Sequence, residues 1–239
     1  MIALDIDRIR RAFPNRTIEY YASIDSTMTL ANGHPIGDVI LAEEQTAGQG
    51  RHGHSWHSAA GDGIYCSIVL PQSPLLTLAL GLATHTAIFE ATGLVCDLRW
   101  PNDLMLGDRK AAGILVQAVG SNAIAGIGIN VNHTAFPDDV AHLATSLRRA
   151  AGRMLHREEI VLALLPAIDT MIAQTKSAIL DSFTHLSSYA SGLRVRVEQP
   201  DGIIEGTTAG LNPDGFLIVR QDDGTDTLIL AGGVRAARS

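Results

Sequence analysis

The sequence has few cysteines, no long apolar run and little positive charge. The first two shortages argue against a disulfide-stabilised secreted protein and against a protein that spans a membrane. Only two cysteines occur among 239 residues. Cys66 and Cys96 both lie in strand-like apolar stretches, which indicates buried thiols in a reducing compartment. A membrane-spanning helix needs about 18 consecutive apolar residues, and the chain has no such run. Acids and arginines occupy residues 1–13, where a signal peptide needs an apolar segment, so we expect a cytoplasmic protein.

Positive charge is scarce as well. Lysine and arginine total 18 against 25 acidic residues, a net charge of −7 with neutral histidines. Proteins that bind nucleic acids carry a basic excess to neutralise phosphates, so we expect no nucleic-acid partner. Apolar residues make up 46% of the chain, which excludes intrinsic disorder. A chain of this length buries roughly 70% of its unfolded surface, and we expect one large domain, or one domain plus a small one.

The first half of the chain is predicted to be mostly sheet. Expected helices span residues 7–13 and 75–92, and expected strands span residues 17–24, 39–42, 64–70, 95–100, 104–106, 110–119 and 123–131. The apolar run 75–92 is too long for a strand, so it indicates a buried helix. Hairpin turns join these strands more often than helices do. This pattern favours an α+β fold, a mixed sheet flanked by helices.

The second half changes character near residue 191. Helices are expected over 157–175, with Pro166 kinking or breaking the first of them, and over 178–189. From Leu193 onward, short β-like runs alternate with turns such as Pro213-Asp214-Gly215, which describes a small β-barrel. We therefore expect two domains, residues 1–191 and residues 192–239.

A glycine-rich loop is the first candidate for chemistry. Gly48, Gly50 and Gly53 allow backbone amides to approach an anion closely. Arg51 adds a charged fork suited to phosphate or carboxylate, and Trp56 offers a flat face for a purine. A mobile surface loop is the alternative interpretation of the glycines and the arginine.

Three histidines of the same region could suggest a metal site. His52, His54 and His57 include a His-x-His spacing, but no cysteine or obvious carboxylate is nearby to complete a tetrahedron. Polar loop residues that contact a ligand are the favoured interpretation.

Two further clusters follow. Asn102 and Asp103 lie just past an expected strand, and Lys110 begins the returning strand, so its ammonium is predicted to lie close to that pair. A solvated hairpin turn is the alternative. Gly126 and Gly128 lie on a central apolar strand and would leave a slot for a flat ligand, or else mark a β-bulge or close packing.

Taken in order, these segments resemble the biotin protein ligase family, the biotin–acetyl-CoA-carboxylase ligases. They are Asp25-Ser26-Thr27, Gln45 with GQGRHGHSW (48–56), RWPND (99–103) with RKAAGIL (109–115), and GIGINVN (126–132). The family has DSTN, Q-x-A-GRGRRG-xx-W, KWPND followed by RK-x-x-GIL, and G-x-GINV. Residues 193–219 resemble its SH3-like C-terminal barrel. The resemblance implies a short form of the family, with a core like that of class II aminoacyl-tRNA synthetases.

The resemblance also implies the reaction. Biotin and Mg-ATP would form biotinyl-5′-AMP, which would then acylate one lysine of a biotin carboxyl carrier protein or domain. The implied cofactors are ATP, Mg²⁺ and biotin as substrate, with magnesium held through the ATP phosphates and no certain protein ligand. We expect a monomer or a weak homodimer.

Residue roles follow from the same resemblance. The implied biotin-binding residues are Ser26, Thr27, Gln45, Gly48, Arg51, Lys110, Gly113, Gly126 and Gly128. The implied ATP- or adenylate-binding residues are Gly50, Arg51, His52, Gly53, Trp56, Asn102, Lys110 and Asn130. The implied catalytic residues are Arg51, Lys110, Asn102 and Asp103.

The chain departs from the family pattern at four positions. Met28 stands where the family usually has Asn, Gln49 and His52 replace loop arginines, and Arg99 replaces the lysine before WPND. The loop is therefore less cationic than the pattern. Because the reference pKa of histidine lies near 6.5, this leaves open whether phosphate affinity falls as pH rises.

Three other functions compete with a biotin protein ligase as interpretations of the sequence. A DNA-binding regulator is disfavoured, because the roughly 25 residues before Ser26 cannot hold a winged-helix domain of about 60. A lipoate or octanoate ligase shares the core, but those acids lack a ureido group to pair with Ser26, Thr27 and Gln45. A module that binds biotin without turnover is the third.

Overall fold

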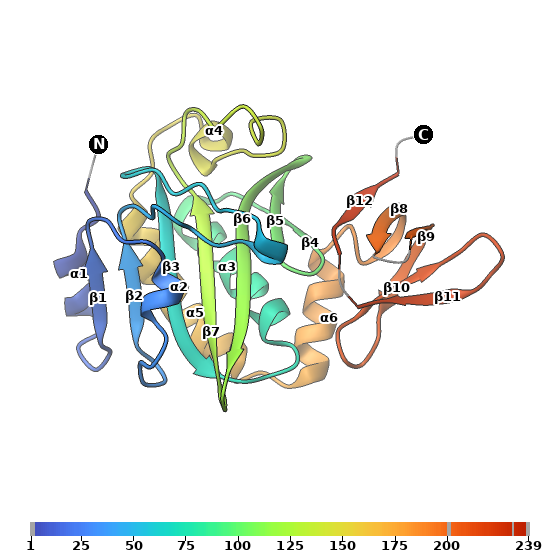
Figure 1. Cartoon of the computed structure of the whole chain (residues 1–239), viewed down its shortest axis with the longest axis horizontal. Coiled ribbons are helices and arrows are strands. Elements are labelled where there is room, and N and C mark those ends of the chain that lie inside the picture. The colour runs from blue at the N-terminus through green and yellow to red at the C-terminus, as the bar shows by residue number, and fades with distance from the viewer. Residues whose placement is uncertain (1–2, 200–201, 231, 238–239) are drawn as a thin grey trace.

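The computed structural model describes residues 3–199, 202–230 and 232–237 (Figure 1). The helices are α1 (Ile6–Ala12), α2 (Thr27–Leu30), α3 (Leu76–Thr92), α4 (Leu147–Ala151), α5 (Arg157–Ile172) and α6 (Lys176–Leu186), with a 3₁₀ turn η1 (Arg51–Gly53). The strands of the first sheet are β1 (Ile18–Tyr21), β2 (Val39–Ala42), β3 (Gly63–Pro71), β4 (Asp97–Arg99), β5 (Asp103–Leu106), β6 (Arg109–Val119) and β7 (Asn122–Asn130).

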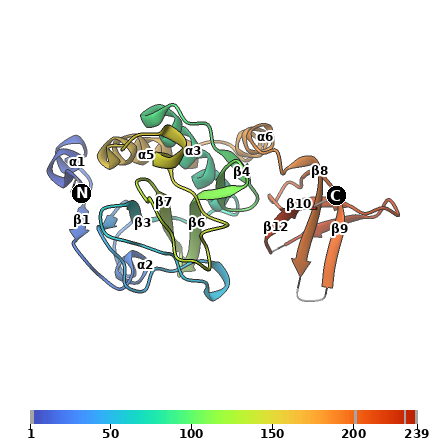
Figure 2. The same ribbon diagram turned by 90° about the horizontal axis from the view of Figure 1, so that it is seen from above.

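In the described part of the chain, seven strands form one mixed sheet in the order β1-β2-β3-β7-β6-β5-β4. The β1–β2 pair is parallel and the other neighbours are antiparallel. Helices α1, α3, α5 and α6 lie on one side of this sheet, whereas α2 and the loop that follows β2 lie on the other (Figure 2). The second face is therefore left for the pocket described below.

The core explains why α3 is apolar on nearly every side. This helix packs against α5, α6 and the sheet, so residues around its whole circumference are buried. Strand β3, which has neighbours on both edges, is buried at every position except its last. On the opposite face a smaller apolar cluster lies under α2. Its buried members are Met28, Ala31, Ile40, Val69 and Ile124.

The C-terminal part forms a second, antiparallel sheet. Its strands are β8 (Ser191–Gln199), β9 (Gly202–Leu211), β10 (Leu217–Arg220), β11 (Asp226–Ile229) and β12 (Val234–Ala236), in the order β11-β10-β9-β8-β12. Within the described residues β11 and β12 lie at opposite edges, so the sheet is open rather than a closed barrel. Trp100 joins it to the first sheet, because its indole N–H donates to the Gly215 carbonyl at 2.9 Å.

The α+β class and the mixed sheet flanked by helices are confirmed. Pro166 was expected to kink or break this helix, and the break is wrong, because α5 runs from Arg157 to Ile172 through that residue. Proline removes one helical hydrogen bond, and the burial of Ile160, Leu164 and Ile168 on the same helix offsets the loss. The short helices α2 and α4 were not predicted.

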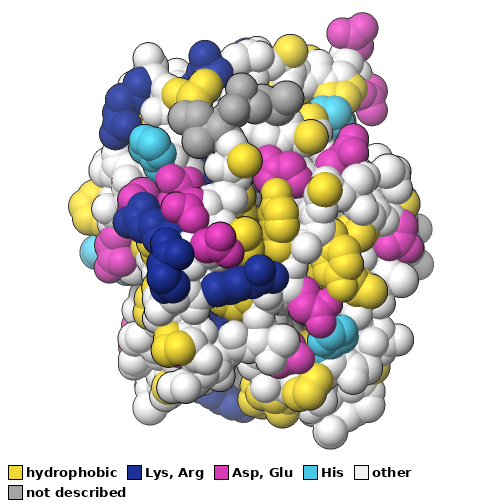
Figure 3. All heavy atoms as spheres, turned by 90° about the vertical axis from the view of Figure 1, so that its left-hand side faces the viewer, with side chains coloured by type: hydrophobic (Ala, Val, Ile, Leu, Met, Phe, Trp, Pro, Cys, Tyr) yellow, Lys and Arg dark blue, Asp and Glu magenta, His cyan; other side chains and the backbone are white. Residues whose placement is uncertain are grey.

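The surface near the N-terminus carries charges of both signs. Over α1 and β1, acidic and basic side chains are mixed rather than gathered by sign (Figure 3). Ion pairs Arg8–Glu159 and Arg16–Asp169 join this end of the chain to α5. Among the described residues, every helix falls short of the length or apolar character that crossing a lipid bilayer requires.

Candidate active site

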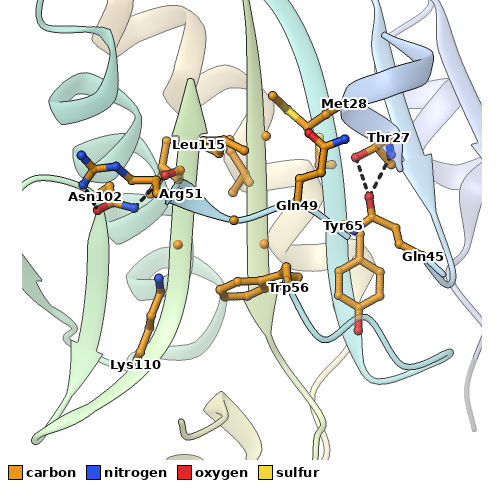
Figure 4. A pocket seen from close by; sticks show the side chains of 17 residues that line it. Thr27, Met28, Gln45, Gln49, Arg51, Trp56, Tyr65, Asn102, Lys110 and Leu115 are labelled. Carbon is orange, nitrogen blue, oxygen red and sulfur yellow. Dashed lines mark hydrogen bonds between the residues drawn. The ribbon is translucent and has the colours of Figure 1, made fainter. Parts of the chain in front are cut away.

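A pocket opens on the sheet face opposite α3 and α5, beneath the loop that joins β2 to β3. Strands β3, β6 and β7 form its floor, and α2 closes one end (Figure 4). It is lined by Thr27, Met28, Gln45, Gln49, Gly50, Arg51, Trp56, Tyr65, Cys66, Asn102, Lys110, Gly113, Ile114, Leu115, Gly126, Ile127 and Gly128. Three separate sequence clusters therefore meet in one cavity.

The end of the pocket beside α2 is polar and neutral. Ser26 caps α2 by accepting a hydrogen bond from the Met28 amide at 3.3 Å, which turns Thr27 toward the cavity. The side-chain oxygen of Gln45 accepts hydrogen bonds from the Thr27 amide at 2.8 Å and the Thr27 hydroxyl at 3.0 Å. This end presents hydroxyl and amide groups and no charge, as a neutral polar ligand requires.

The middle of the pocket is shaped by glycines. A Cβ on Gly128 would lie 2.4 Å from the Trp56 ring, and one on Gly113 would lie 2.7 Å from Cε of Lys110. A Cβ on Gly126 would lie 2.6 Å from the Met28 sulfur. The missing side chains thus make room for Trp56, Lys110 and Met28, which line the cavity themselves.

The far end is cationic. The Arg51 guanidinium donates to the Asn102 side-chain oxygen at 3.0 Å, and the Asn102 amide donates to the Ile114 carbonyl at 2.9 Å. Burial lowers the pKa of Arg51 below its usual value. A guanidinium remains protonated in proteins, so Arg51 is a fixed, partly desolvated positive charge at this end.

Lys110 stands across from Arg51, below it in Figure 4. Its ammonium lies 2.6 Å from Asp103 and 5.3 Å from the centroid of the Trp56 ring. Asp103 also binds Arg99 at 2.6 Å. Burial by itself would raise the pKa of Asp103, but the two cations outweigh it and hold that pKa below its usual value. The carboxylate thus stays ionised and positions Lys110.

The glycine-rich loop wraps over the cavity through its own backbone. The Trp56 amide donates to the Gly48 carbonyl at 2.8 Å, and the Gly50 amide donates to His54 at 2.7 Å. A Cβ on Gly48 would lie 2.4 Å from the Trp56 carbonyl oxygen, so only glycine fits there. His52 has a φ of 55°, and it and Gly53 are exposed.

Most of the predicted site residues lie in this pocket. Thr27, Gln45, Gly50, Arg51, Trp56, Asn102, Lys110, Gly113, Gly126 and Gly128 line it. The remaining six do not line it: Ser26, Gly48, His52, Gly53, Asp103 and Asn130. Asn130 lies behind Lys110, and its side-chain amide reaches the Lys110 carbonyl at 3.5 Å.

Sequence reasoning gave no role to several lining residues. Tyr65, Cys66, Ile114, Leu115 and Ile127 were given no role in binding. Alternation does not single them out, because Tyr65 and Cys66 are consecutive and point to opposite faces, and the strand order β3-β7-β6 is what brings them to the pocket. Among the described residues, no group of three or more His, Cys, Asp or Glu side chains could hold a metal ion.

Comparisons with known proteins agree with this geometry. Residues 20–133 match the model of the "Biotin/lipoate A/B protein ligase family", and residues 190–234 match that of the "Biotin protein ligase C terminal domain". The chain is 30% identical over 233 residues to the biotin–[acetyl-CoA-carboxylase] ligase of Paracoccus denitrificans, covering 87% of this chain and 95% of that one. This chain belongs to the biotin protein ligase family.

Other relatives support the same assignment. The bifunctional ligase/repressor BirA of Bacillus subtilis is 31% identical over 229 residues, which is 86% of this chain and 70% of BirA. The structure of the Aquifex aeolicus biotin protein ligase in complex with biotin and ATP superposes with a TM-score of 0.83 at 29% identity, covering 93% of this chain and 99% of that chain. The resemblance seen in the sequence motifs is confirmed at the level of family and fold.

Proposed function

We propose that this chain is an ATP-dependent biotin protein ligase that makes biotinyl-5′-AMP and transfers biotin to a lysine of a biotin carboxyl carrier protein. One observation carries the proposal. The pocket joins a neutral polar end at Thr27 and Gln45 to a cationic end at Arg51 and Lys110, along a glycine floor. Biotin has the same division, with a ureido head at one end and a carboxylate at the other.

The ureido head fits the neutral end. It carries N–H donors and one strong acceptor, which hydroxyl and amide groups can satisfy. We assign the head to Thr27 and Gln45, with Ser26 and Gly48 supporting them through the α2 cap and the loop backbone. The apolar rings and chain then lie along Gly126 and Gly113 against Leu115.

The cationic end fits the first chemical step. An oxygen of the biotin carboxylate attacks the α-phosphorus of ATP, the bond to the bridging oxygen breaks, and pyrophosphate leaves with the electron pair. Two anions must come together in this step, so Arg51 and Lys110 act by neutralising them. The Lys110 ammonium has three donors, so it can keep its contact with Asp103 and still reach an anionic oxygen.

In the second step a carrier lysine attacks the acyl carbon as the free amine. The bond to the AMP phosphate breaks, AMP leaves, and the new amide nitrogen loses its proton. Retaining the adenylate until this attack is a task for charges near its phosphate, which we assign to Arg51 with the amide of Gly53.

The nucleotide is assigned to the Trp56 side of the pocket. Trp56 offers a ring for base stacking, and Asn102, His52 and Asn130 complete this region. Magnesium would enter as Mg-ATP, held by phosphates, because the nearby carboxylate of Asp103 is already bound to Arg99 and Lys110.

We further propose a catalytic domain of residues 1–191, a C-terminal domain of residues 192–239, and a cytoplasmic monomer or weak homodimer that binds no nucleic acid or membrane.

A direct assay tests the function. The protein is incubated with biotin, Mg-ATP and a carrier domain, and biotin on the carrier lysine is detected by mass spectrometry. A parallel reaction replaces biotin with lipoate or octanoate, which lack a ureido head. Transfer of biotin alone is expected. Transfer of lipoate or octanoate in preference to biotin would contradict the proposal, and biotin binding without pyrophosphate release would indicate a non-catalytic module.

A further inference from the structure

A continuous chain of side-chain hydrogen bonds runs from β3 to the loop over the pocket. The Ser67 hydroxyl lies 2.7 Å from that of Thr27, which lies 3.0 Å from the side-chain oxygen of Gln45. The Gln45 amide nitrogen lies 2.9 Å from the Ser58 hydroxyl, which lies 3.1 Å from the Trp56 carbonyl. The Thr27–Gln45 links are drawn in Figure 4. One network therefore spans the polar end of the cavity.

The direction of every hydrogen bond in this chain is fixed by its backbone contacts. The Thr27 backbone N–H can only donate, so the Gln45 atom that faces it at 2.8 Å is the oxygen. The Thr27 hydroxyl must then give its single hydrogen to that same oxygen. At the other end the Trp56 carbonyl can only accept, so Ser58 donates to it and accepts from Gln45.

The same accounting settles the role of Ser67. The Thr27 hydroxyl donates its single hydrogen to Gln45, so it can only accept from Ser67. The Ser67 hydroxyl is therefore the donor of that hydrogen bond. Ser67 is 0% exposed and does not line the pocket. It therefore acts on a ligand only through Thr27.

The directions of these hydrogen bonds determine which donor and acceptor groups remain for a ligand. Thr27 keeps one free lone pair and presents an acceptor, whereas Gln45 keeps one free N–H and presents a donor. A cyclic urea presents the complement, an N–H beside a carbonyl oxygen. This step rests on the proposed function, because it takes biotin as the ligand.

We propose that Ser67 is a positioning residue for biotin recognition, because its hydroxyl occupies one lone pair of the Thr27 oxygen and so aims the other at the ureido N–H. Without that donor, Thr27 still donates its hydrogen to Gln45, but its oxygen can turn about that bond and no longer holds a lone pair toward the ligand. A single neutral hydrogen bond of this kind corresponds to roughly a threefold to tenfold change in affinity. We expect the effect on biotin rather than on ATP, because Ser67 donates to Thr27 at the neutral end of the pocket.

The test measures steady-state biotinylation of a carrier domain by Ser67→Ala. We expect the KM for biotin to rise about three- to tenfold, with kcat and the KM for ATP unchanged. Desthiobiotin, which keeps the urea, should show the same factor. The isosteric pair Ser67→Thr and Ser67→Val separates the hydroxyl from side-chain volume, and only Thr should keep a KM near that of the wild type.

Thr84→Val is the matched control. It also removes a 0% exposed hydroxyl, one that donates to the Leu80 carbonyl within α3, away from the pocket. Its melting temperature should fall while its KM for biotin stays at the wild-type value. The proposal is overturned if Ser67→Ala leaves the KM for biotin unchanged, raises both KM values together, or affects desthiobiotin less than biotin.

Failure of the proposed function would look different. In that case the wild-type protein itself would not biotinylate the carrier. Calorimetric titration with biotin would then still compare Ser67→Ala with the wild type, and an equal dissociation constant for both would overturn the role of Ser67.

Discussion

Replacing Gly128 by alanine is the sharpest test of how the pocket floor positions Trp56. The new Cβ would lie 2.4 Å from Cε2 and 2.6 Å from Nε1 of the indole. Carbon atoms in contact stay about 3.5–4.0 Å apart, so the ring would have to move by roughly 1 Å or more. The strand cannot yield instead, because β7 pairs with β3 on one edge and β6 on the other. The indole is rigid, so the loop that carries it must shift.

The expected consequence is a selective loss of nucleotide binding. Base–aromatic stacking is worth about 1–3 kcal/mol, so the KM for ATP in pyrophosphate–ATP exchange should rise about five- to a hundredfold. The fold should tolerate the change, because alanine in a strand costs less conformational entropy than glycine. Gly126→Ala is the matched control on the same strand. It meets the flexible end of Met28, so it should affect the KM for biotin and leave that for ATP unchanged.

A double-mutant cycle decides whether the effect passes through the ring. Trp56→Ala alone should raise the KM for ATP and leave biotin affinity, measured by calorimetry, nearly unchanged. If Gly128 acts only by placing the indole, adding Gly128→Ala to Trp56→Ala should cost nothing further. Fully additive effects would refute the reasoning, and an equal loss of biotin affinity in Trp56→Ala would assign the ring to core packing.

Four further outcomes are expected. Lys110→Ala should slow pyrophosphate–ATP exchange about 10²–10³-fold, and exchange at the wild-type rate would refute its role. Arg51→Gly should release the adenylate about ten- to a hundredfold faster and label serum albumin present in the assay, whereas adenylate formed without labelling would assign retention elsewhere. Asp103→Asn should be less stable than the wild type in urea at pH 7. Because the native pKa of Asp103 is lowered, that difference should persist above about pH 4 and close as pH falls further. Burial raises the pKa values of Cys66 and Cys96 to about 12, so iodoacetamide at pH 8 should modify both only after unfolding.

The strands and long helices could be predicted because each carries its own local signal. The run 75–92 is apolar on nearly all sides, and the structure shows why, since α3 packs against the sheet, α5 and α6. Pro166 does not break α5, because burial along the helix offsets the hydrogen bond that proline removes, and this burial cannot be read from the local sequence. α2 escaped notice because it has only four residues, and its signal is a single cap at Ser26.

Part of the candidate site could also be predicted from the sequence. Arg51, Trp56 and Lys110 could be assigned to one site, since each lies in a segment with its own recognisable motif. The network from Ser67 to Ser58 could not be predicted, because Ser67 is an ordinary polar residue within an apolar strand. Its partner is 40 residues away in sequence, and only strand pairing and the α2 cap bring the two hydroxyls together.

The four departures from the family pattern find their places in the structure. Arg99 forms an ion pair with Asp103, as a lysine at this position could, so the positive charge beside Asp103 is kept. Gln49 donates to the Thr29 hydroxyl at 3.2 Å and thereby ties the loop to α2 without adding charge. Met28 packs its sulfur against Gly126 at the margin of the apolar cluster under α2.

His52 is the departure with the clearest functional meaning. Its φ of 55° and its exposure direct it away from the lining of the pocket, where Arg51 occupies the cationic end. A histidine there does not alter the charge that lines the pocket. Our proposal gives the anion chemistry to two cations, Arg51 and Lys110, and with them a less basic loop is compatible with adenylate formation. We therefore propose that the loop retains the adenylate through Arg51 rather than through the number of its arginines.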